Sequence, residues 1–524
     1  MKLSRALAAG LVSVLAAAAP GQAQEKADLF RVSSWRLGPD LLDGDAGNTA
    51  IVEARAIEID GAQLLAGQEK LRFELFEGTR YEAVLSGLER RGPEDVTWRG
   101  WLGAPGGDRV VLTTQGAHVT GMVFSPEGVY EIAPLAGGGH RLAQIDHDRF
   151  PECGGNPSPS GPATAFGDDA LAEAADSADQ IDVMIAYTPQ ARTAAGGTAA
   201  IRATAQSAVD MANTSFIDSG MVARFVLVSI IQAGYNDSGD MGADLDWLTS
   251  DAAIAAARDV ARADMVGLIV EGGQACGVGF VMQSPAAWFA SYAFQVTARS
   301  CAVGNLSYAH EHGHNMGMEH NPENGSSPAQ ASYPWSFGHY VNGLFRTVMS
   351  YSNPCANGCT RVARFSNPNL TYAGQPTGIA DQRDNHRTGD LTAPIVANFR
   401  QRALGDFHTL TPCRLLDTRQ GAALISGVPR MLLTAGQCGV PATASALAVN
   451  VTMTGATSPG YISLQVGNPW PTTTTTLHFG SGQSRGNNAI IPVSGDGAGR
   501  LSIQPQLQSA GTAHVIVDVS GYFN

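Results

Sequence analysis

The most informative segment of the sequence is LSYAHEHGHNMGMEHN, which spans residues 306–321. His310 and His314 are four residues apart, so on a helix both imidazoles lie on one face and can bind the same metal ion. Glu311 is rotated by about 100° from His310, which places its carboxylate beside such an ion rather than on it. The spacing therefore predicts a metal-binding helix with an acid–base group next to the metal.

A third ligand follows the predicted helix. Gly317 allows the backbone to leave the helix in a left-handed conformation and to turn back, which brings His320 within reach of the metal. Three neutral histidines leave a fourth position open, an arrangement typical of a catalytic zinc and not of a structural one. The alternative, an exposed helix rich in histidine, would produce the pattern H-E-x-x-H-x-x-G-x-x-H only rarely by chance.

This pattern is the zinc signature of the metzincin metalloproteases, and the chain resembles that clan. Within it, the chain looks most like the reprolysin-like and bacterial peptidyl-Asp metallopeptidase families. The resemblance covers about residues 180–403. It implies a catalytic domain with a mixed α/β (α+β) sheet, a zinc-binding helix and one catalytic zinc. It also implies a methionine in a tight turn below the metal, and Met349 in the sequence TVMSY matches.

Tyr351 departs from the reprolysin pattern, which usually has proline two residues after this methionine. In this respect the chain resembles astacins and serralysins, in which the tyrosine ligates zinc and steadies the oxyanion. The alternative is a buried tyrosine that is hydrogen-bonded in the turn.

The resemblance implies a metalloendopeptidase in which Glu311 deprotonates a zinc-bound water that attacks the peptide carbonyl. We expect Trp288–Ala298, which alternates like an edge strand, to bind extended peptide substrates by backbone pairing. Arg346, Arg361 and Arg364 lie around the methionine turn. An arginine there would favour acidic substrate residues, as the peptidyl-Asp resemblance implies; the alternative is that these are ordinary surface arginines.

The N-terminus predicts export. Lys2 and Arg5 precede a short apolar run, and Gly21-Gln22-Ala23 offers small residues for cleavage, so residues 1–23 fit a secretory signal. The run is too short to span a membrane. We therefore expect a secreted protein that does not span a membrane.

Residues 24–153 read as a β-rich propeptide and residues 154–180, rich in Gly, Pro, Ser and Ala, as a linker. The sequence Pro-Glu-Cys-Gly around Cys153 resembles the cysteine switch of matrixins and reprolysins, in which a thiolate fills the open zinc position. It lacks the neighbouring Arg and Asp of the matrixin version. The alternative is a free or intermolecularly paired thiol.

The organisation continues with the catalytic domain at 181–403 and a module at 404–524. Short β runs between Gly, Asn and Thr turns predict that this module is an all-β sandwich. It resembles modules at the ends of secreted bacterial enzymes; a surface or polysaccharide ligand and a purely structural role both remain open.

The overall charge of the chain argues against one class of partner, nucleic acids. The formal net charge of −14 has the wrong sign for binding nucleic acid. Protein or peptide substrates are what the metzincin resemblance implies. The acidic loop Asp237–Asp246 is either a calcium site or merely solvated.

The chain has seven cysteines, an odd number. Six of them lie close to one another in sequence in three pairs, and disulfides within these pairs are the simplest of several possible pairings. Cys153 then has no partner among them. Two rival functions remain, a catalytically inactive secreted binding or adhesion protein on a metzincin scaffold and a zinc hydrolase for a non-peptide substrate.

Overall fold

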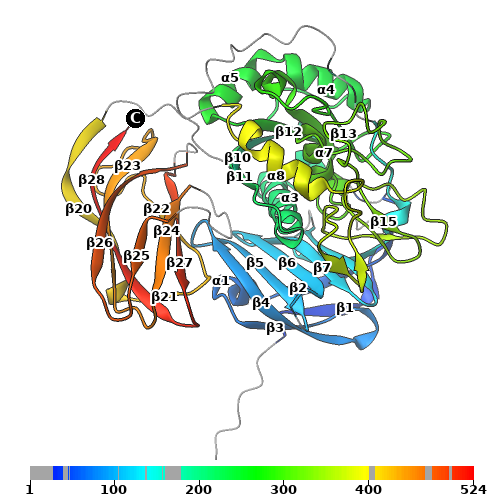
Figure 1. Ribbon diagram of the computed structural model, residues 1–524. Coiled ribbons are helices and arrows are strands. Elements are labelled where there is room, and N and C mark those ends of the chain that lie inside the picture. Colours follow the sequence, from blue (N-terminus) through cyan, green and yellow to red (C-terminus); the bar gives the residue numbers. More distant parts are fainter. Residues whose placement is uncertain are drawn as a thin grey trace, which may run out of the picture.

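The computed structural model describes residues 28–38, 45, 48–103, 105–135, 138–155, 157, 159, 179–400, 407–466, 475–494 and 498–523. These residues form an N-terminal sheet, a central domain of helices around a sheet, and a C-terminal pair of sheets (Figure 1). The expected signal at 1–23 and most of the expected linker at 154–180 lie outside the described residues. In the part of the chain that is described, no helix is both long and apolar enough to cross a membrane.

The N-terminal part is one antiparallel sheet of nine strands in the order β1-β2-β9-β8-β7-β6-β5-β4-β3. Its strands are β1 Phe30–Arg36, β2 Ile51–Ile59, β3 Lys70–Glu74, β4 Arg80–Arg90, β5 Asp95–Leu102, β6 Asp108–Gln115, β7 His118–Ser125, β8 Gly128–Pro134 and β9 His140–Ile145. The short helix α1 (Gly61–Leu65) contributes Leu64 to a core that also holds Trp98. The predicted β-rich character of this region is confirmed.

The central domain is built on a mixed sheet in the order β11-β10-β12-β14-β13. Strands β10 (Gln180–Tyr187), β11 (Arg224–Gln232), β12 (Met265–Val270) and β14 (Phe294–Ala298) run parallel, and β13 (Gly277–Gly279) runs antiparallel to β14. Its helices are α2 Pro189–Ala194, α3 Thr198–Asp218, α4 Met241–Ser250, α5 Ala252–Ala261, α6 Arg299–Ala302, α7 Ser307–Asn315 and α8 Asn385–Val396. Strands such as β12, buried at every position, read as continuous apolar runs because helices cover both faces of the sheet.

The expectation of an edge strand over Trp288–Ala298 is wrong. Its first half is the 3₁₀ helix Ala287–Tyr292, and its second half, β14, lies inside the sheet between β12 and β13. The edge is instead the three-residue strand β13, whose Gly-Val-Gly sequence carries little β propensity and so gave no signal.

The C-terminal part contains two antiparallel sheets, in the orders β20-β28-β23-β26, with β21 paired to β28, and β22-β27-β24-β25. Their strands are β20 Phe407–Asp417, β21 Leu424–Ile425, β22 Arg430–Leu433, β23 Ala446–Thr454, β24 Gly460–Gln465, β25 Leu477–Phe479, β26 Arg485–Pro492, β27 Arg500–Leu507 and β28 Thr512–Phe523. Side chains from both sheets, among them Val451 and Ile503, form one shared core. The predicted β-rich character holds here as well.

Three disulfides follow the nearest-neighbour pairing: Cys276–Cys301, Cys355–Cys359 and Cys413–Cys438. Cys153 is the free cysteine. The first bridge ties the chain before β13 to α6, so the edge of the central sheet is fixed covalently beside the helix that follows.

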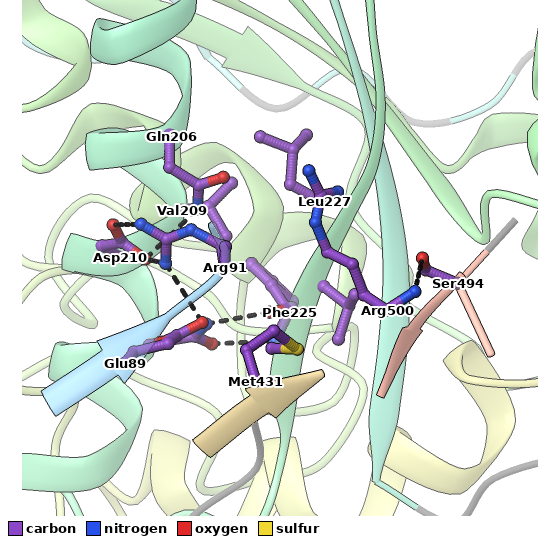
Figure 2. Close-up of a pocket in the computed structure, with 12 residues that line it drawn as sticks. Glu89, Arg91, Gln206, Val209, Asp210, Phe225, Leu227, Met431, Ser494 and Arg500 are labelled. Carbon is purple, nitrogen blue, oxygen red and sulfur yellow. Dashed lines mark hydrogen bonds and ion pairs between the residues drawn. The ribbon is translucent and has the colours of Figure 1, made fainter. Parts of the chain in front are cut away.

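The N-terminal sheet and α3 are joined by buried ion pairs. Arg91 lies 3.1 Å from Asp210, and Arg109 pairs with Asp218 at the end of the same helix. Figure 2 shows Arg91 and Asp210 in a pocket that Met431 and Arg500 of the C-terminal sheets also line, so all three parts of the chain meet there.

Candidate metal centre

Helix α7 carries the first two histidines of the sequence motif. All nine of its residues are buried, and it packs against β13 and β14. After the helix, Gly317 has a φ of +83°, the left-handed conformation expected from the sequence. A Cβ atom there would lie only 3.0 Å from the carbonyl oxygen of Met282, so the turn also needs glycine for space. This turn brings His320 back towards the helix.

The three histidines converge through their Nε2 atoms. His314 Nε2 lies 3.0 Å from His320 Nε2, which in turn lies 3.2 Å from His310 Nε2. Each Nδ1 instead faces a backbone carbonyl oxygen, those of Val348, Met318 and Asn324 for His310, His314 and His320 in that order. This pairing places the proton on Nδ1 and leaves the Nε2 lone pairs directed at one point.

Such a donor set fits zinc. Burial lowers the pKa of all three imidazoles, so they are neutral, the form that binds a metal. Tetrahedral zinc with Zn–N bonds of about 2.05 Å separates its ligand atoms by about 3.3 Å, close to the distances found here. Three lone pairs that face one another without a proton between them repel unless a cation lies among them.

Cys153 from the end of the N-terminal part supplies a fourth donor. Its Sγ and the three histidine nitrogens all lie within 4.8 Å of one another, and in the described part of the chain they are the only such group of metal-binding side chains. The thiol also lies 3.5 Å from Glu311 Oε2. Burial, and then the charge of Glu311, raises the pKa of this thiol; a bound divalent cation acts in the opposite direction because it stabilises the thiolate.

Glu311 lies beside the histidines and against the edge strand. A Cβ atom on Gly277 would lie 2.6 Å from the Glu311 carboxylate, so only glycine lets β13 approach so closely. Burial raises the pKa of Glu311 to about 8. A carboxyl group with a pKa near neutrality can both accept and return a proton, which suits general acid–base chemistry.

The methionine turn lies under the helix. Met349 is fully buried, and a Cβ atom on Gly313 of α7 would come within 2.5 Å of its sulfur. Tyr351 is nearby, with its ring centroid 4.2 Å from that of His320 and its hydroxyl donating to the Cys153 carbonyl over 3.0 Å. Burial raises the pKa of Tyr351 well above its usual value, so the phenol keeps its proton and acts as a donor.

The three arginines have different surroundings. Arg346 donates to the carbonyl oxygens of Ser350 and His147, and Arg361 lies 3.8 Å from the Glu152 carboxylate. Arg364 donates instead to the carbonyl oxygen of Asp218 at the end of α3. None is a surface arginine, since all three are buried.

The acidic loop is held by its own hydrogen bonds. Asp240 caps α4, Asp244 accepts from Tyr235 and Ser238, and Asp237 accepts backbone N–H groups after β12. Calcium binding at Asp237–Asp246 therefore stays a prediction.

Two residues at this centre were missed by the sequence reasoning. Glu152 and Ser352 bond to each other beside the metal group. The sequence offers only one indication of their role: Glu152 directly precedes Cys153, and Ser352 directly follows Tyr351.

Known proteins resemble the chain in the same region. The reprolysin-like model of metallopeptidase family M12B matches residues 178–383. The peptidyl-Asp metalloendopeptidase of Stenotrophomonas maltophilia strain R551-3 is 30% identical over 380 residues, covering 67% of this chain and 87% of that protein. Its counterpart from Xanthomonas campestris pv. campestris is 28% identical over 368 residues, covering 66% and 86%. Among solved structures, metalloproteinase-II from Bacteroides fragilis covers 51% of this chain and 85% of its own at 10% identity, with a TM-score of 0.32.

Proposed function

Because the chain belongs to the reprolysin-like metallopeptidases of family M12B and is a zinc metalloendopeptidase, we propose that His310, His314 and His320 hold its zinc and that Glu311 is its general base. The observation that carries this assignment is the convergence of three Nε2 atoms, each fixed through Nδ1, beside a buried carboxyl group. Met349 supports the centre from below.

Zinc, when bound, polarises the peptide carbonyl and makes water a better nucleophile at neutral pH. Glu311 accepts the proton of the attacking water and delivers it to the leaving amine. The Tyr351 hydroxyl donates to the carbonyl oxygen of the scissile bond, as it does now to the carbonyl of Cys153.

Extended substrates bind along β13 through their backbone. The segment at Cys153 already bonds in this way: Gly154 N donates to Gly277 O over 2.7 Å, and Cys276 N donates to Glu152 O over 3.2 Å. An added strand of this kind gives affinity without regard to side chains, and this supports protein and peptide substrates over small non-peptide ones.

We further propose that the chain is made as a latent, exported precursor. Residues 1–23 would be the signal, 24–153 the propeptide with Cys153 as the inhibitory ligand, and 154–180 the linker that is cut. Residues 181–403 would be the catalytic domain and 404–524 a β-sandwich module, for which a surface or polysaccharide ligand and a purely structural role both stay open. Three disulfides are consistent with an oxidising compartment, and the thiol within 4.8 Å of the histidine nitrogens supports latency.

A preference for acidic residues next to the cleaved bond completes the proposal. It is supported by the names of the relatives, peptidyl-Asp metalloendopeptidases, and by the buried arginines near the centre.

The test compares the wild-type chain with Glu311→Gln after elastase has cut the 154–180 segment and has been inhibited. We expect the wild type to cleave casein, a chelator to abolish that cleavage, and the variant to lose at least about 10²- to 10⁴-fold in kcat/KM. The zinc content of the two proteins, measured by elemental analysis, should be equal. A wild type that binds zinc but cleaves nothing would favour the inactive binding scaffold.

A further inference from the structure

Glu152, the residue before Cys153, lies in a polar site next to the metal centre. Its Oε1 accepts a hydrogen bond from the backbone N–H of Ser352 over 2.7 Å and another from the Ser352 hydroxyl. Its Oε2 lies 3.8 Å from a guanidinium nitrogen of Arg361. The carboxylate is thus held by an N–H group, a hydroxyl and a cation at once.

Among the described residues of the central domain, no carboxylate lies within ion-pair distance of Arg361. Its side chain is only 3% exposed, and it donates to the carbonyl oxygens of Asn305 and Ser350. Among the described residues, Glu152 is the only carboxylate within ion-pair distance of it, and its Nε has no hydrogen-bond partner. Burying a cation without a counter-ion is costly, so Glu152 stabilises Arg361 in the uncleaved chain, and its departure makes this cation available to another anion.

Arg346 strengthens the positive field at this place. It is buried, bonds only to carbonyl oxygens, and forms no ion pair among the described residues. Burial, and then the positive charge of the neighbouring Arg361, lowers the pKa of Arg346 to about 9. Two buried cations without acids of their own make the site complementary to a negative charge.

The backbone around Glu152 lies along the strand edge where we propose that substrates bind. Residues 152–154 bond to Cys276 and Gly277 at the sheet edge, and the sulfur of Cys153 lies at the metal group. Cys153 is therefore the residue at the metal group, and Glu152 is the residue directly before it. In a bound substrate this corresponds to a residue that adjoins the scissile bond.

We propose that Ser352 and Arg361 form a pocket for the carboxylate of an acidic substrate residue next to the scissile bond, and that Glu152 occupies this pocket in the uncleaved chain. The pocket rests on the proposed function, because it selects substrates for the peptidase centre. It identifies Ser352 and Arg361, and not Arg364, as specificity-determining residues. Glu152 then has a second effect: it denies the pocket to substrates until the N-terminal part departs.

The experiment uses two peptides that differ only by Asp or Asn at one position, and full-length chains activated with elastase. The wild type should cleave the Asp peptide at least about tenfold faster in kcat/KM, with the cut beside the Asp. Arg361→Gln should lower the Asp/Asn ratio by about 10- to 100-fold, because it removes the cation that lies 3.8 Å from the Glu152 carboxylate. The measured quantity is the ratio of the two rates, which a general loss of activity leaves unchanged. Ser352→Ala should lower this ratio less than Arg361→Gln does, because the backbone N–H of residue 352 remains.

The matched control is Arg364→Gln, which removes a buried arginine that bonds to Asp218 rather than to Glu152. Its Asp/Asn ratio should equal that of the wild type. A wild type that cleaves both peptides equally, or an active Arg361→Gln that keeps the ratio, overturns the pocket while leaving the peptidase function intact. A wild type that cleaves neither peptide overturns the proposed function itself.

A second measurement needs no catalysis and covers the case in which Arg361→Gln misfolds. In the uncleaved chain, Glu152→Gln should raise the rate at which a maleimide labels Cys153 by about tenfold. The reason is that the charged carboxylate no longer binds residues 152–154 to Ser352 and Arg361. The control is Glu127→Gln, in the exposed turn between β7 and β8. An unchanged labelling rate would show that Glu152 does not occupy a binding pocket.

Discussion

The hydroxyl of Tyr351 donates a hydrogen bond to the carbonyl oxygen of Cys153 over 3.0 Å. One side chain of the central domain therefore holds the backbone of the N-terminal part at the residue whose sulfur lies among the three histidines. A phenol in this place can serve two states of the protein: it binds a carbonyl of the chain itself before cleavage and a carbonyl of the substrate afterwards.

Tyr351→Phe should separate these two roles. We expect the activated enzyme to lose about 10- to 100-fold in kcat with little change in KM, since a donor to the developing oxyanion acts mainly in the transition state. The measurement is steady-state hydrolysis of a peptide after elastase activation. An unchanged kcat would leave Tyr351 as a packing residue of the turn.

Cys153→Ala should weaken latency. We expect the uncleaved variant to hydrolyse peptides at least about tenfold faster than the uncleaved wild type, because the fourth donor is gone from the metal group. Zymography combined with mass spectrometry would show that residues 154–180 are still uncut. Ser125→Ala, on β7, is the control and should remain latent. Continued latency of the Cys153 variant would count against a role for the thiol.

Asp210→Ala should destabilise the uncleaved chain by about 1–3 kcal/mol, because it removes a buried carboxylate that accepts hydrogen bonds from Arg91 and Thr97. Arg91 keeps its ion pairs with Glu89 and Asp95, so the cost stays below that of an unpaired buried charge. Urea unfolding of the full chain measures this cost. Glu82→Ala is the control, since it removes an ion pair with Lys70 that is largely exposed and should cost at most about 1 kcal/mol. Similar costs for the two variants would contradict the view that the sheet docks through buried charges.

Acid should loosen the segment that carries Cys153. His147 bonds to the carbonyl oxygen of Gly304, and burial together with Arg346 lowers the pKa of His147 to about 3. An exposed histidine titrates near 6.5, so the undocked segment binds more protons below that pH. Docking is therefore strongest above pH 6.5 and is lost progressively as the pH falls towards 3, by about 1.4 kcal/mol per unit.

The measurement is the unfolding free energy of the full chain at pH 7 and pH 5 for the wild type and His147→Asn. The wild type should lose about 2 kcal/mol more than the variant over this interval. The comparison with His147→Asn is needed because burial also lowers the pKa of His140, to about 4. His140 therefore also reduces the unfolding free energy of both proteins between pH 7 and pH 5. His408→Asn, at an exposed position in β20, should behave as the wild type; equal losses in all three proteins would contradict the prediction.

The sequence predicted the helix and turn that carry the histidines, but it did not predict which distant residues contact them. Helix α7 and the left-handed Gly317 follow from spacing and from the conformational freedom of glycine, both of which are local properties. The boundary between α4 and α5 is local in the same sense, because Asp251 ends α4 and caps the first turn of α5 with its side chain.

The pairing of Glu152 with Ser352 could not be predicted, because 200 residues separate them and neither belongs to a motif. The same holds for Arg91 and Asp210, which lie in different parts of the chain. Apolar periodicity reports which face of an element is buried, but it does not report which polar side chain on another element meets it there.

Glycine at both ends of β13 has a lasting consequence for how this enzyme can diversify. A Cβ atom at Gly277 or Gly279 would crowd Glu311 of α7, so both positions favour glycine. On the proposed function, β13 therefore offers a substrate mainly its backbone groups at these two positions. Changes of preference would then arise in the turns that bear Ser352 and Arg361, where a substitution would alter which bond is cut and leave the three histidines in place.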